Sequence, residues 1–557
     1  MLSINWSDVW KMVESIKVPL IVIGVALALA IIVSLAVMKL SKPARKLARS
    51  TAWIAAFVTA VLAVVSMMYG GFKTVLDLAS GSGVLTDASK AQVEKLGNDI
   101  ADEGMVLLKN TNAVLPLAEG SAINVWGWGS TNPIYGGTGS GSLSKDNPTT
   151  SLLDGLRGAG FTTNDELTDL YTSYRAERPE VGMFKADWSL PEPTKDKYTQ
   201  ELLDIVQAFG ETAVVTIARS GGEGFDLPRD VNKETSENPA FSYTNNSEQY
   251  ADFEDGQGYL ELTRPEKDMI ELAKQTSAKT VVVINAANAF QLGDLQDDPE
   301  IDAIGTMAHD MQVSGWYAPA TNTHRYAYAG RNFEYFSEDP VLAGSQVAEE
   351  IKGAQAKGVY AFLKHFALND QETNRTHMLA TWTNEQAMRE IYLRSFEIGV
   401  KDGGAHAIMS AFNYIGTEYA GAKSALLKTV LRDEWGFRGM VLTDYFAGLG
   451  YQNADQITRH GGDIMLATID MPVATLNVQD AAGVTALRGA AHNILYTVAN
   501  SWMYENGQPE VERNAWEYVT WAVAGGLILA LVGLEVVALR RYRARRAGAD
   551  EAGAGKG

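Results

Sequence analysis

Cysteine is absent from this sequence of 557 residues. A disulfide framework, a thiolate metal site and a cysteine nucleophile are therefore excluded. Histidine is scarce, and the seven histidines show no HExxH or other metal-ligand spacing. No repeat or low-complexity tract precedes the short Ala/Gly-rich tail. We therefore expect a chain of packed domains that works without a catalytic metal or another cofactor.

Positive charge is scarce in the middle of the chain. The formal net charge is −20, and residues 1–72 carry +5 and residues 516–557 carry +2, which leaves −27 for residues 73–515. A polyanion such as nucleic acid would be repelled by this middle region, whereas a neutral sugar would not. The charge distribution therefore argues against a nucleic-acid partner.

Three long apolar stretches are long enough to span a bilayer, which needs about 20 apolar residues. Val18–Met38 has no charged residue, Thr51–Phe72 is almost as apolar, and Tyr518–Leu539 contains one acid, Glu535. The first stretch also has the length of a signal peptide, but no small-residue cleavage site precedes the second. We interpret all of them as membrane anchors. Because no charged pairs lie inside them, a transporter is not favoured.

Basic residues are concentrated in two segments beside the apolar stretches. The loop at 39–50 contains five lysines and arginines without an acid, and RRYRARR follows the last stretch from Arg540. The positive-inside rule places both segments in the cytoplasm, so residues 73–515 would lie outside the cell, tethered at both ends. The predicted membrane parts are a transmembrane hairpin at 1–72, a transmembrane helix at 516–540 and a cytoplasmic tail at 541–557.

Residues 79–305 alternate between strand and helix patterns. Continuous apolar strands between helices are typical of a mostly parallel sheet covered on both faces, which predicts an α/β sandwich domain. The polar segments 173–200 and 227–258 are interpreted as long loops, which are usually functional. The predicted strands begin at Ala122, Thr212 and Thr280, and the predicted helices cover Lys90–Leu108 and start at Thr150 and Pro265.

Residues 306–500 show a second series with the rhythm of a β/α barrel. Polar and ionisable residues gather where its strands end, and active sites of (β/α)₈ barrels lie at that edge. Only five strand patterns are visible where eight are expected, so we predict a partial barrel within an α/β protein. These strands begin at Gly315, Val359, Ala405, Met440 and Asp463.

Asp444 is the first candidate catalytic residue. It ends the apolar strand MVLTD and precedes Tyr445 and Phe446. A carboxylate on a barrel rim between aromatic side chains is suited to attack the anomeric carbon of a sugar. A strand-end aspartate also commonly caps the following helix.

Two further loops of this region carry candidate sugar-binding cations. KHFALNDQETNR begins with Lys364 and His365, which are able to donate hydrogen bonds to sugar hydroxyls. The alternative is a structural salt bridge between Lys364 and an acid of the same loop. GRNFEYFSEDP places Arg331 beside Glu334, and its alternative is an ordinary ion-paired surface loop.

A glycine-rich loop in the first domain offers a second carboxylate. SGGEGFD follows the strand TAVVTIAR, and its glycines allow a sharp turn that exposes Glu223 as a general acid/base; the alternative is a solvated glutamate. GGTGSGS, from Gly136, looks like a phosphate-binding loop but lacks the Lys-Ser/Thr ending and the GxGxxG spacing, so we do not expect nucleotide binding.

Together these segments resemble glycoside hydrolase family 3. The sandwich domain precedes the barrel here, an order found in a subgroup of that family. The segments similar to its barrel domain are 315–340, 364–375, 409–413 and 430–448, and those similar to its sandwich domain are 103–117, 136–142, 217–226 and 279–293.

The resemblance implies a retaining, exo-type β-glucosidase-like hydrolase that acts on extracellular β-glycosides without a cofactor. It assigns Asp444 as the nucleophile and Glu223 as the acid/base. Met409 falls near the same site, and ALNDQETNR is similar to β-glucosidases and β-xylosidases rather than to the β-N-acetylglucosaminidase branch. The sugar-binding positions that it implies are Arg331, Lys364 and His365.

One departure from the family leaves a second function open. After residue 304 the chain enters GTMAHDMQVSGWYAP directly, without the first barrel strands or their sugar-gripping aspartate in a motif like DGPHG. A full barrel needs about 250 residues, and 306–500 is shorter than that. The alternative is an inactive surface protein that binds or senses carbohydrate. The sequence does not fix the oligomeric state.

Overall fold

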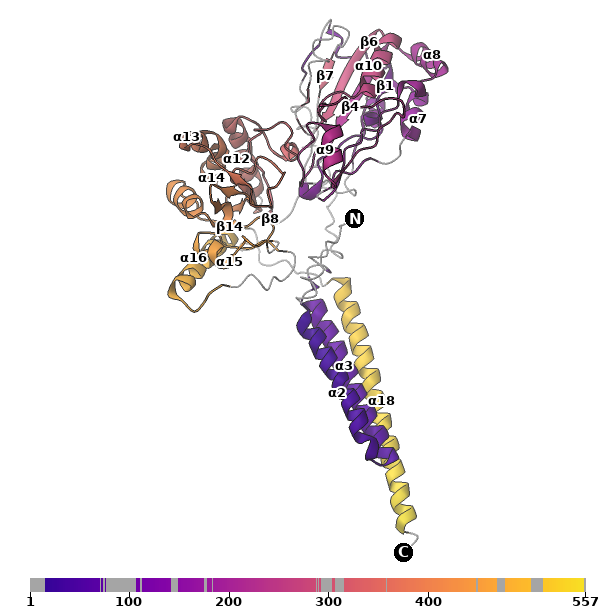
Figure 1. Ribbon diagram of the computed structural model, residues 1–557, viewed down its shortest axis with the longest axis vertical. Helices are drawn as coiled ribbons and strands as arrows, with labels where there is room; N and C mark the ends of the chain where they lie inside the picture. Colours follow the sequence, from indigo (N-terminus) through magenta and orange to yellow (C-terminus); the bar gives the residue numbers. More distant parts are fainter. Residues whose placement is uncertain are drawn as a thin grey trace.

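The structure is a computed structural model. It describes residues 16–70, 72–73, 76, 107–110, 113–141, 149–174, 178–182, 184–286, 288, 290–291, 303–305, 315–356, 358–446, 449–467, 476–501 and 514–554. Figure 1 shows two lobes and a separate bundle of long helices. The predicted helix over Lys90–Leu108 lies mostly outside the described residues.

Three helices are long and apolar enough to cross a membrane, and they lie side by side in the bundle (Figure 1). They are α2 (Lys17–Ala36), α3 (Lys42–Tyr69) and α18 (Ala515–Ala554). The short turn η1 (Val37–Lys39) leads from α2 to α3, so these two helices form a hairpin. The predicted hairpin and C-terminal span therefore correspond to helices of the structure.

Polar contacts join the bundle near its basic end. The guanidinium group of Arg49 donates to the backbone oxygen of Ser34 at 2.8 and 2.9 Å, which ties α3 to α2. Thr51 Oγ1 donates to Glu535 Oε1 at 2.5 Å, which ties α3 to α18. The turn between α2 and α3 and the end of α18 lie at the same end of the bundle, away from both lobes (Figure 1). The two basic segments therefore share one side.

The first lobe is built on a parallel sheet in the order β2-β1-β4-β6-β7. Its central strands β4 and β6 pair along their whole length, from Thr212 with Lys279 to Arg219 with Ala286. The three strands predicted from apolar runs are present. The strands are β1 (Ala122–Trp126), β2 (Thr162–Thr163), β4 (Thr212–Arg219), β6 (Lys279–Ala286) and β7 (Ala303–Gly305).

Helices cover this sheet because each presents an apolar stripe to it. In α10 the stripe contains Met269, Ile270 and Ala273, which pack against Val215 and Ile217 of β4 in one buried cluster. This helix starts at a capping box in which Thr263 and Glu266 satisfy each other's backbone groups. The helices of this lobe are α6 (Leu152–Gly158), α7 (Asp165–Tyr174), α8 (Gln200–Phe209) and α10 (Arg264–Thr276).

The two segments predicted as long loops are more ordered than expected. They contain the helix α9 (Val231–Glu237) and the small parallel sheet of β3 (Ala186–Asp187) and β5 (Phe241–Ser242). Trp188 and Phe253 are fully buried in a cluster of their own beside the main sheet. The polar composition hid these few aromatic anchors, each of which buries a large apolar area.

The second lobe has a parallel sheet in the order β14-β11-β9-β8, and Ile464 adds a bridge to Leu442 beyond β14. These are the five strand positions that the sequence predicts, and the sheet is open among the described residues. Its strands are β8 (Gly315–Trp316), β9 (Tyr360–Phe366), β11 (Ala407–Ser410) and β14 (Met440–Leu442).

Helices pack on one face of this sheet, where they bury an aliphatic and aromatic core that includes Phe396, Leu427 and Leu363. A three-stranded sheet lies beside it. The helices of the whole lobe are α12 (Pro340–Ala356), α13 (Glu385–Ala387), η7 (Met388–Tyr392), α14 (Arg394–Lys401), η9 (Ala425–Glu434), α15 (Ala454–Arg459) and α16 (Ala481–Ala499), and the strands of the three-stranded sheet are β10 (Ala380–Thr381), β12 (Tyr414–Ile415) and β13 (Glu418–Tyr419).

Helix α16 contributes to the other face of the open sheet. Ile494 packs against a cluster that contains Phe362 and Leu442. Thr497 donates to the backbone oxygen of His406 at 2.7 Å and accepts from the backbone nitrogen of Met440 at 3.0 Å. This helix thus covers apolar surface and backbone groups at the starts of β11 and β14. The predicted boundary between residues 305 and 306 adjoins residues outside the described part and stays a prediction.

A buried acid in the first lobe makes its stability depend on pH. Glu192 is 5% exposed, and it accepts hydrogen bonds from the backbone nitrogen of Trp128 at 3.0 Å and the hydroxyl of Tyr198 at 3.2 Å. Burial raises the pKa of Glu192 from 4.5 to about 8. The folded state therefore holds this proton where the unfolded state has lost it, so the unfolding free energy falls as pH rises between these values.

We predict that Glu192→Gln removes most of this pH dependence. Glutamine is neutral at every pH and keeps one acceptor and one donor for the same partners. In urea unfolding of the full chain, wild type should lose roughly 4 kcal/mol relative to Glu192→Gln between about pH 5 and about pH 8.5. Parallel stability curves for the two proteins would contradict the prediction.

Candidate active site

Asp444 lies two residues after β14, at the carboxyl edge of the second sheet. Its backbone nitrogen donates to Ser410 at the end of β11, and its Oδ1 accepts from the backbone nitrogen of Tyr445 at 2.8 Å. Its Oδ2 is buried and has no hydrogen-bond partner among the described residues. An oxygen of this kind is free to attack, because no hydrogen bond has to be broken first.

Glu223 lies in the loop after β4, and residues 138–140 of the glycine run hold it there. Ser140 donates its backbone N–H to Glu223 Oε2 at 2.8 Å, and Thr138 forms a parallel bridge with Gly222. Gly139 has a φ of +88°, and a Cβ at this position would lie 2.4 Å from the Cβ of Glu223. The glycine run that resembled a phosphate loop therefore binds a carboxylate of the protein itself.

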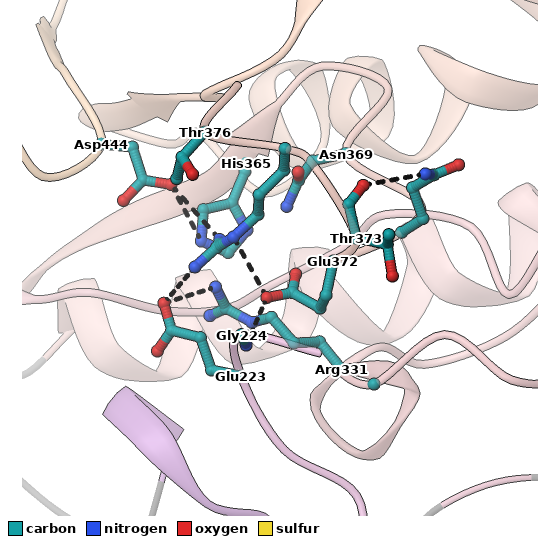
Figure 2. A network of polar contacts seen from close by, with 12 residues as sticks. Glu223, Gly224, Arg331, His365, Asn369, Glu372, Thr373, Thr376 and Asp444 are labelled. Carbon is teal, nitrogen blue, oxygen red and sulfur yellow. Dashed lines mark hydrogen bonds and ion pairs between the residues drawn. The ribbon is translucent and has the colours of Figure 1, made fainter. Parts of the chain in front are cut away.

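Glu223 and Asp444 lie on the two sides of one polar network (Figure 2), and Arg375 contacts both carboxyl groups. Its Nη2 donates to Glu223 Oε1 at 2.5 Å, and its Nη1 lies 3.9 Å from Asp444 Oδ2. Its guanidinium group also stacks over the ring of Phe412, with 5.0 Å from the central carbon to the ring centroid. A single planar side chain therefore spans the two predicted catalytic acids, which come from different lobes.

The predicted sugar-binding cations belong to the same network. Arg331 donates to Glu334 and, at 3.3 Å, to Glu223 Oε1, and it is 1% exposed. Lys364 Nζ lies 3.3 Å from Glu334 Oε2. Its salt bridge is with Glu334 rather than with an acid of its own loop. These two cations and Glu223 therefore form one buried, ion-paired cluster.

His365 lies beside the nucleophile candidate without pairing with it. Its Nε2 is 3.8 Å from Asp444 Oδ2, and its backbone groups exchange hydrogen bonds with the side chain of Asn322. Burial lowers the pKa of His365 well below its usual value, and the neighbouring cations lower it further. The imidazole is therefore neutral, and the contact with Asp444 is polar rather than ionic.

Met409 lies apart from this polar cluster. It belongs to β11 and is 3% exposed, within the apolar cluster of Phe362 and Leu442. Its neighbours in that cluster are apolar, so its location indicates a packing role beneath the site. The substrate-binding role that the resemblance implies for Met409 stays a prediction.

The charges of the resting site favour an ionised Glu223. Burial raises the pKa of this carboxyl, but Arg331 and Arg375 outweigh it and hold the pKa well below its usual range. For Asp444 burial dominates and raises the pKa above its usual value, against the lowering effect of Arg375 and Arg331. The two acids thus have pKa values shifted in opposite directions, and in the resting site these directions are the reverse of those that a protonated acid and an ionised nucleophile need.

Two residues of this network were missed by the sequence reasoning. Arg375 and Glu372 lie in the segment that suggested Lys364 and His365, but only its first two residues were chosen. Burial raises the pKa of Glu372 to about 7. The signal that was available is the spacing of charged residues in QETNR, where an acid precedes a cation by three positions.

The arrangement has the components that acid/base and nucleophilic chemistry on a neutral substrate require. It offers an unpartnered carboxylate oxygen, a second carboxylate and several hydrogen-bond donors. Within the described ranges, no group of three or more His, Asp or Glu side chains is arranged to hold a metal ion.

Two family models match the chain in sequence. The model of the glycosyl hydrolase family 3 C-terminal domain matches residues 105–316, and that of the N-terminal domain matches residues 285–481. The order of the two matches is the reverse of their names. This agrees with the predicted order, in which the sandwich precedes the barrel-like region.

Curated relatives are similar over shorter segments. Beta-glucosidase A of Butyrivibrio fibrisolvens is 41% identical over 162 residues, which are 29% of this chain and 19% of that protein. Beta-glucosidase B of Emericella nidulans is 48% identical over 128 residues, which are 23% of this chain and 15% of that protein. The matched segments therefore span less than a fifth of the length of either relative.

The fold is shared with a solved structure. A beta-glucosidase from Paenibacillus barengoltzii superposes with a TM-score of 0.61 over 77% of this chain and 87% of that chain, at 15% identity. At this identity the likeness concerns the fold alone. The two family models cover residues 105–481 between them, which is more than half of the sequence, and the chain therefore belongs to glycoside hydrolase family 3.

Proposed function

We propose that this chain is a retaining β-glycosidase, similar to β-glucosidases, that hydrolyses extracellular β-glycosides by an exo-type reaction. The observation that carries the proposal is the contact of one guanidinium group, that of Arg375, with both Glu223 and Asp444. A retaining enzyme needs two carboxyl groups about 5–5.5 Å apart across the scissile bond. The similarity to beta-glucosidases of known name supports the substrate class.

In the first step Asp444 Oδ2 attacks the anomeric carbon. The bond to the leaving oxygen breaks, and that oxygen takes the proton of Glu223. The product is a glycosyl ester on Asp444 and a free aglycone. Arg331, Lys364 and His365 donate hydrogen bonds to the hydroxyl groups of the sugar.

In the second step an ionised Glu223 takes a proton from water while the water oxygen attacks the anomeric carbon and the ester bond to Asp444 breaks. The resting charges suit this step, because Arg331 and Arg375 favour the ionised form of Glu223. The first step needs a protonated Glu223. The sugar therefore has to displace Arg375 from Glu223, which lets the pKa of this carboxyl rise.

We also propose that the bundle anchors both lobes outside the cell. The support is the basic composition of the α2–α3 turn and of the C-terminal tail, together with their location at one end of the bundle. A catalytic region held at both ends beside the membrane would act on substrates in the surrounding medium rather than on cytoplasmic metabolites.

The second candidate is a surface protein that binds carbohydrate without hydrolysing it. It is favoured by the resting arrangement of the site, in which Arg375 contacts both acids and Glu223 and Asp444 are each 6% exposed. A protein that kept this arrangement when a sugar bound would have no protonated acid. The two functions differ in turnover, not in binding.

We predict that the full chain in detergent hydrolyses aryl β-glucosides and that Asp444→Ala lowers kcat by at least about 10³-fold, because the nucleophile is lost. Glu349→Ala serves as the control, since Glu349 is an exposed acid paired with Lys352 on the second lobe. Release of the aryl group measures turnover, and the anomeric form of the first product, read by NMR, should be β. Sugar binding without turnover in either protein would favour the second candidate.

We predict that Arg375→Gln moves the alkaline limb of the kcat/KM profile to higher pH. Arg375 lowers the pKa of both Glu223 and Asp444, so its loss raises the pKa of both acids and with them the pH at which the reactive form is lost. The variant should also lose roughly 3–5 kcal/mol of unfolding free energy, because a buried ion pair loses one partner. Arg389→Gln, which breaks an exposed pair with Glu434, is the control. An unmoved alkaline limb would refute the electrostatic explanation.

We predict that single cysteines introduced into this cysteine-free chain report its orientation. A membrane-impermeant maleimide should label Glu349→Cys on intact cells. Lys46→Cys in the basic turn region and Arg543→Cys in the tail should react only after the membrane is permeabilised, because the positive-inside rule places both in the cytoplasm. Labelling of the two basic positions on intact cells would show that the orientation is the opposite of the proposed one.

A further inference from the structure

The loop that carries Glu223 is joined to the second lobe by Asp226. This carboxylate accepts hydrogen bonds from the backbone nitrogens of Glu372 at 2.8 Å and Thr373 at 3.1 Å. It also accepts from the backbone nitrogen of Gly330 at 3.2 Å. An acid of the first lobe thus satisfies backbone groups of two loops of the second lobe.

Glu372 makes the reverse contact. Its Oε2 accepts from the backbone nitrogen of Gly224, the residue after Glu223, at 2.8 Å. The same oxygen lies 3.1 Å from Nε of Arg375, whose Nη2 donates to Glu223. Glu372 therefore contacts Gly224, which follows Glu223 in the chain (Figure 2). It also contacts Arg375, the cation that binds the carboxyl group of Glu223.

We propose that Asp226 and Glu372 are positioning residues that clamp the loop of Glu223 onto the second lobe and so fix the distance between Glu223 and Asp444. The proposal rests on the proposed hydrolase function for its catalytic consequence. Neither residue would touch the sugar. Each would act through the position of Glu223.

The burial of both side chains favours this role over a general structural one. Asp226 is 9% exposed and Glu372 is 2% exposed, so their hydrogen bonds compete little with water. Glu372 Oε1 has no hydrogen-bond partner among the described residues, so the buried acid is retained despite an incompletely satisfied carboxyl group. A residue needed only for packing would be served better by an apolar side chain of the same size.

The sequence reason for the clamp is the glycine content of the loop. Gly224 has a φ of +111°, so the loop adopts a conformation that few residues reach and has no side chain to pack at this position. Such a segment has many alternative conformations when it is free. A loop that must hold a catalytic carboxyl to within a fraction of an ångström therefore needs contacts from outside.

The first test compares substrates that differ in their need for an acid. We expect Glu372→Ala in the full chain to lower kcat/KM for phenyl β-glucoside by about 10²-fold, which is the size of an acid/base contribution. For 2,4-dinitrophenyl β-glucoside, whose leaving group needs no proton, kcat/KM, which reports the glycosylation step, should fall far less. Glu372→Gln keeps an acceptor for Gly224 and should recover part of the loss. Equal losses on both substrates would overturn the positioning role.

The second test does not depend on turnover. Hydrogen exchange of the amides in 220–226 should become faster in Glu372→Ala and Asp226→Ala than in wild type, while the control Glu349→Ala leaves it unchanged. Unchanged exchange in both clamp variants would overturn the inference. If wild type hydrolyses neither glucoside but exchange responds as expected, the clamp stands and the hydrolase proposal alone fails. Protection of the other segments shows whether each variant is folded.

Discussion

Buried charge at the junction of the two lobes is the constraint on which the site depends. Arg331, Arg375 and Lys364 are almost inaccessible to water, and an unpaired buried cation costs several kcal/mol. Their partners come from both lobes, since Glu223 belongs to the first and Glu334 and Glu372 belong to the second. If the lobes separated, Arg331 and Arg375 would lose the carboxylate of Glu223, which neutralises part of their charge. The ion-paired network of the candidate site thus also holds the lobes together.

The strands and the location of the site could be predicted from the sequence for a common physical reason. Buried parallel strands are continuous apolar runs, and polar residues directly after such runs must gather at one edge of the sheet. This reasoning located Asp444, Lys364 and His365, and it found the glycine-rich loop of Glu223. What it lacked is the pairing across lobes. Arg375 lies in a polar loop whose backbone is held by Asp226 of the first lobe, and no local pattern encodes a contact over such a separation.

The open sheet of the second lobe shows a different limit of sequence reasoning. The pattern predicts five strand positions correctly where a full barrel has eight, and a sheet that does not close leaves edges and a face that other elements must cover. The pattern does not predict that a helix would take part of that surface. In α16, Ile494 covers apolar groups and Thr497 satisfies backbone groups of β11 and β14. The hydroxyl of Thr497 both donates and accepts, so it takes the place of two hydrogen-bond partners in the sheet. An apolar residue at this position would leave the backbone oxygen of His406 and the backbone nitrogen of Met440 unsatisfied.

The glycine run at 136–142 shows why a motif is better interpreted by its physical property than by its familiar ligand. Backbone N–H groups freed by glycine bind an anion, whether that anion is a phosphate or a carboxylate. Here Ser140 donates to Glu223, and Gly139 makes room for the side chain. The missing Lys-Ser/Thr ending argues against nucleotide binding, but the anion-binding property of the run remains. In Glu223 one carboxylate oxygen pairs with Arg331 and Arg375, and the other accepts the backbone N–H of Ser140. The glycine run thus orients the carboxyl group that the two arginines pair with.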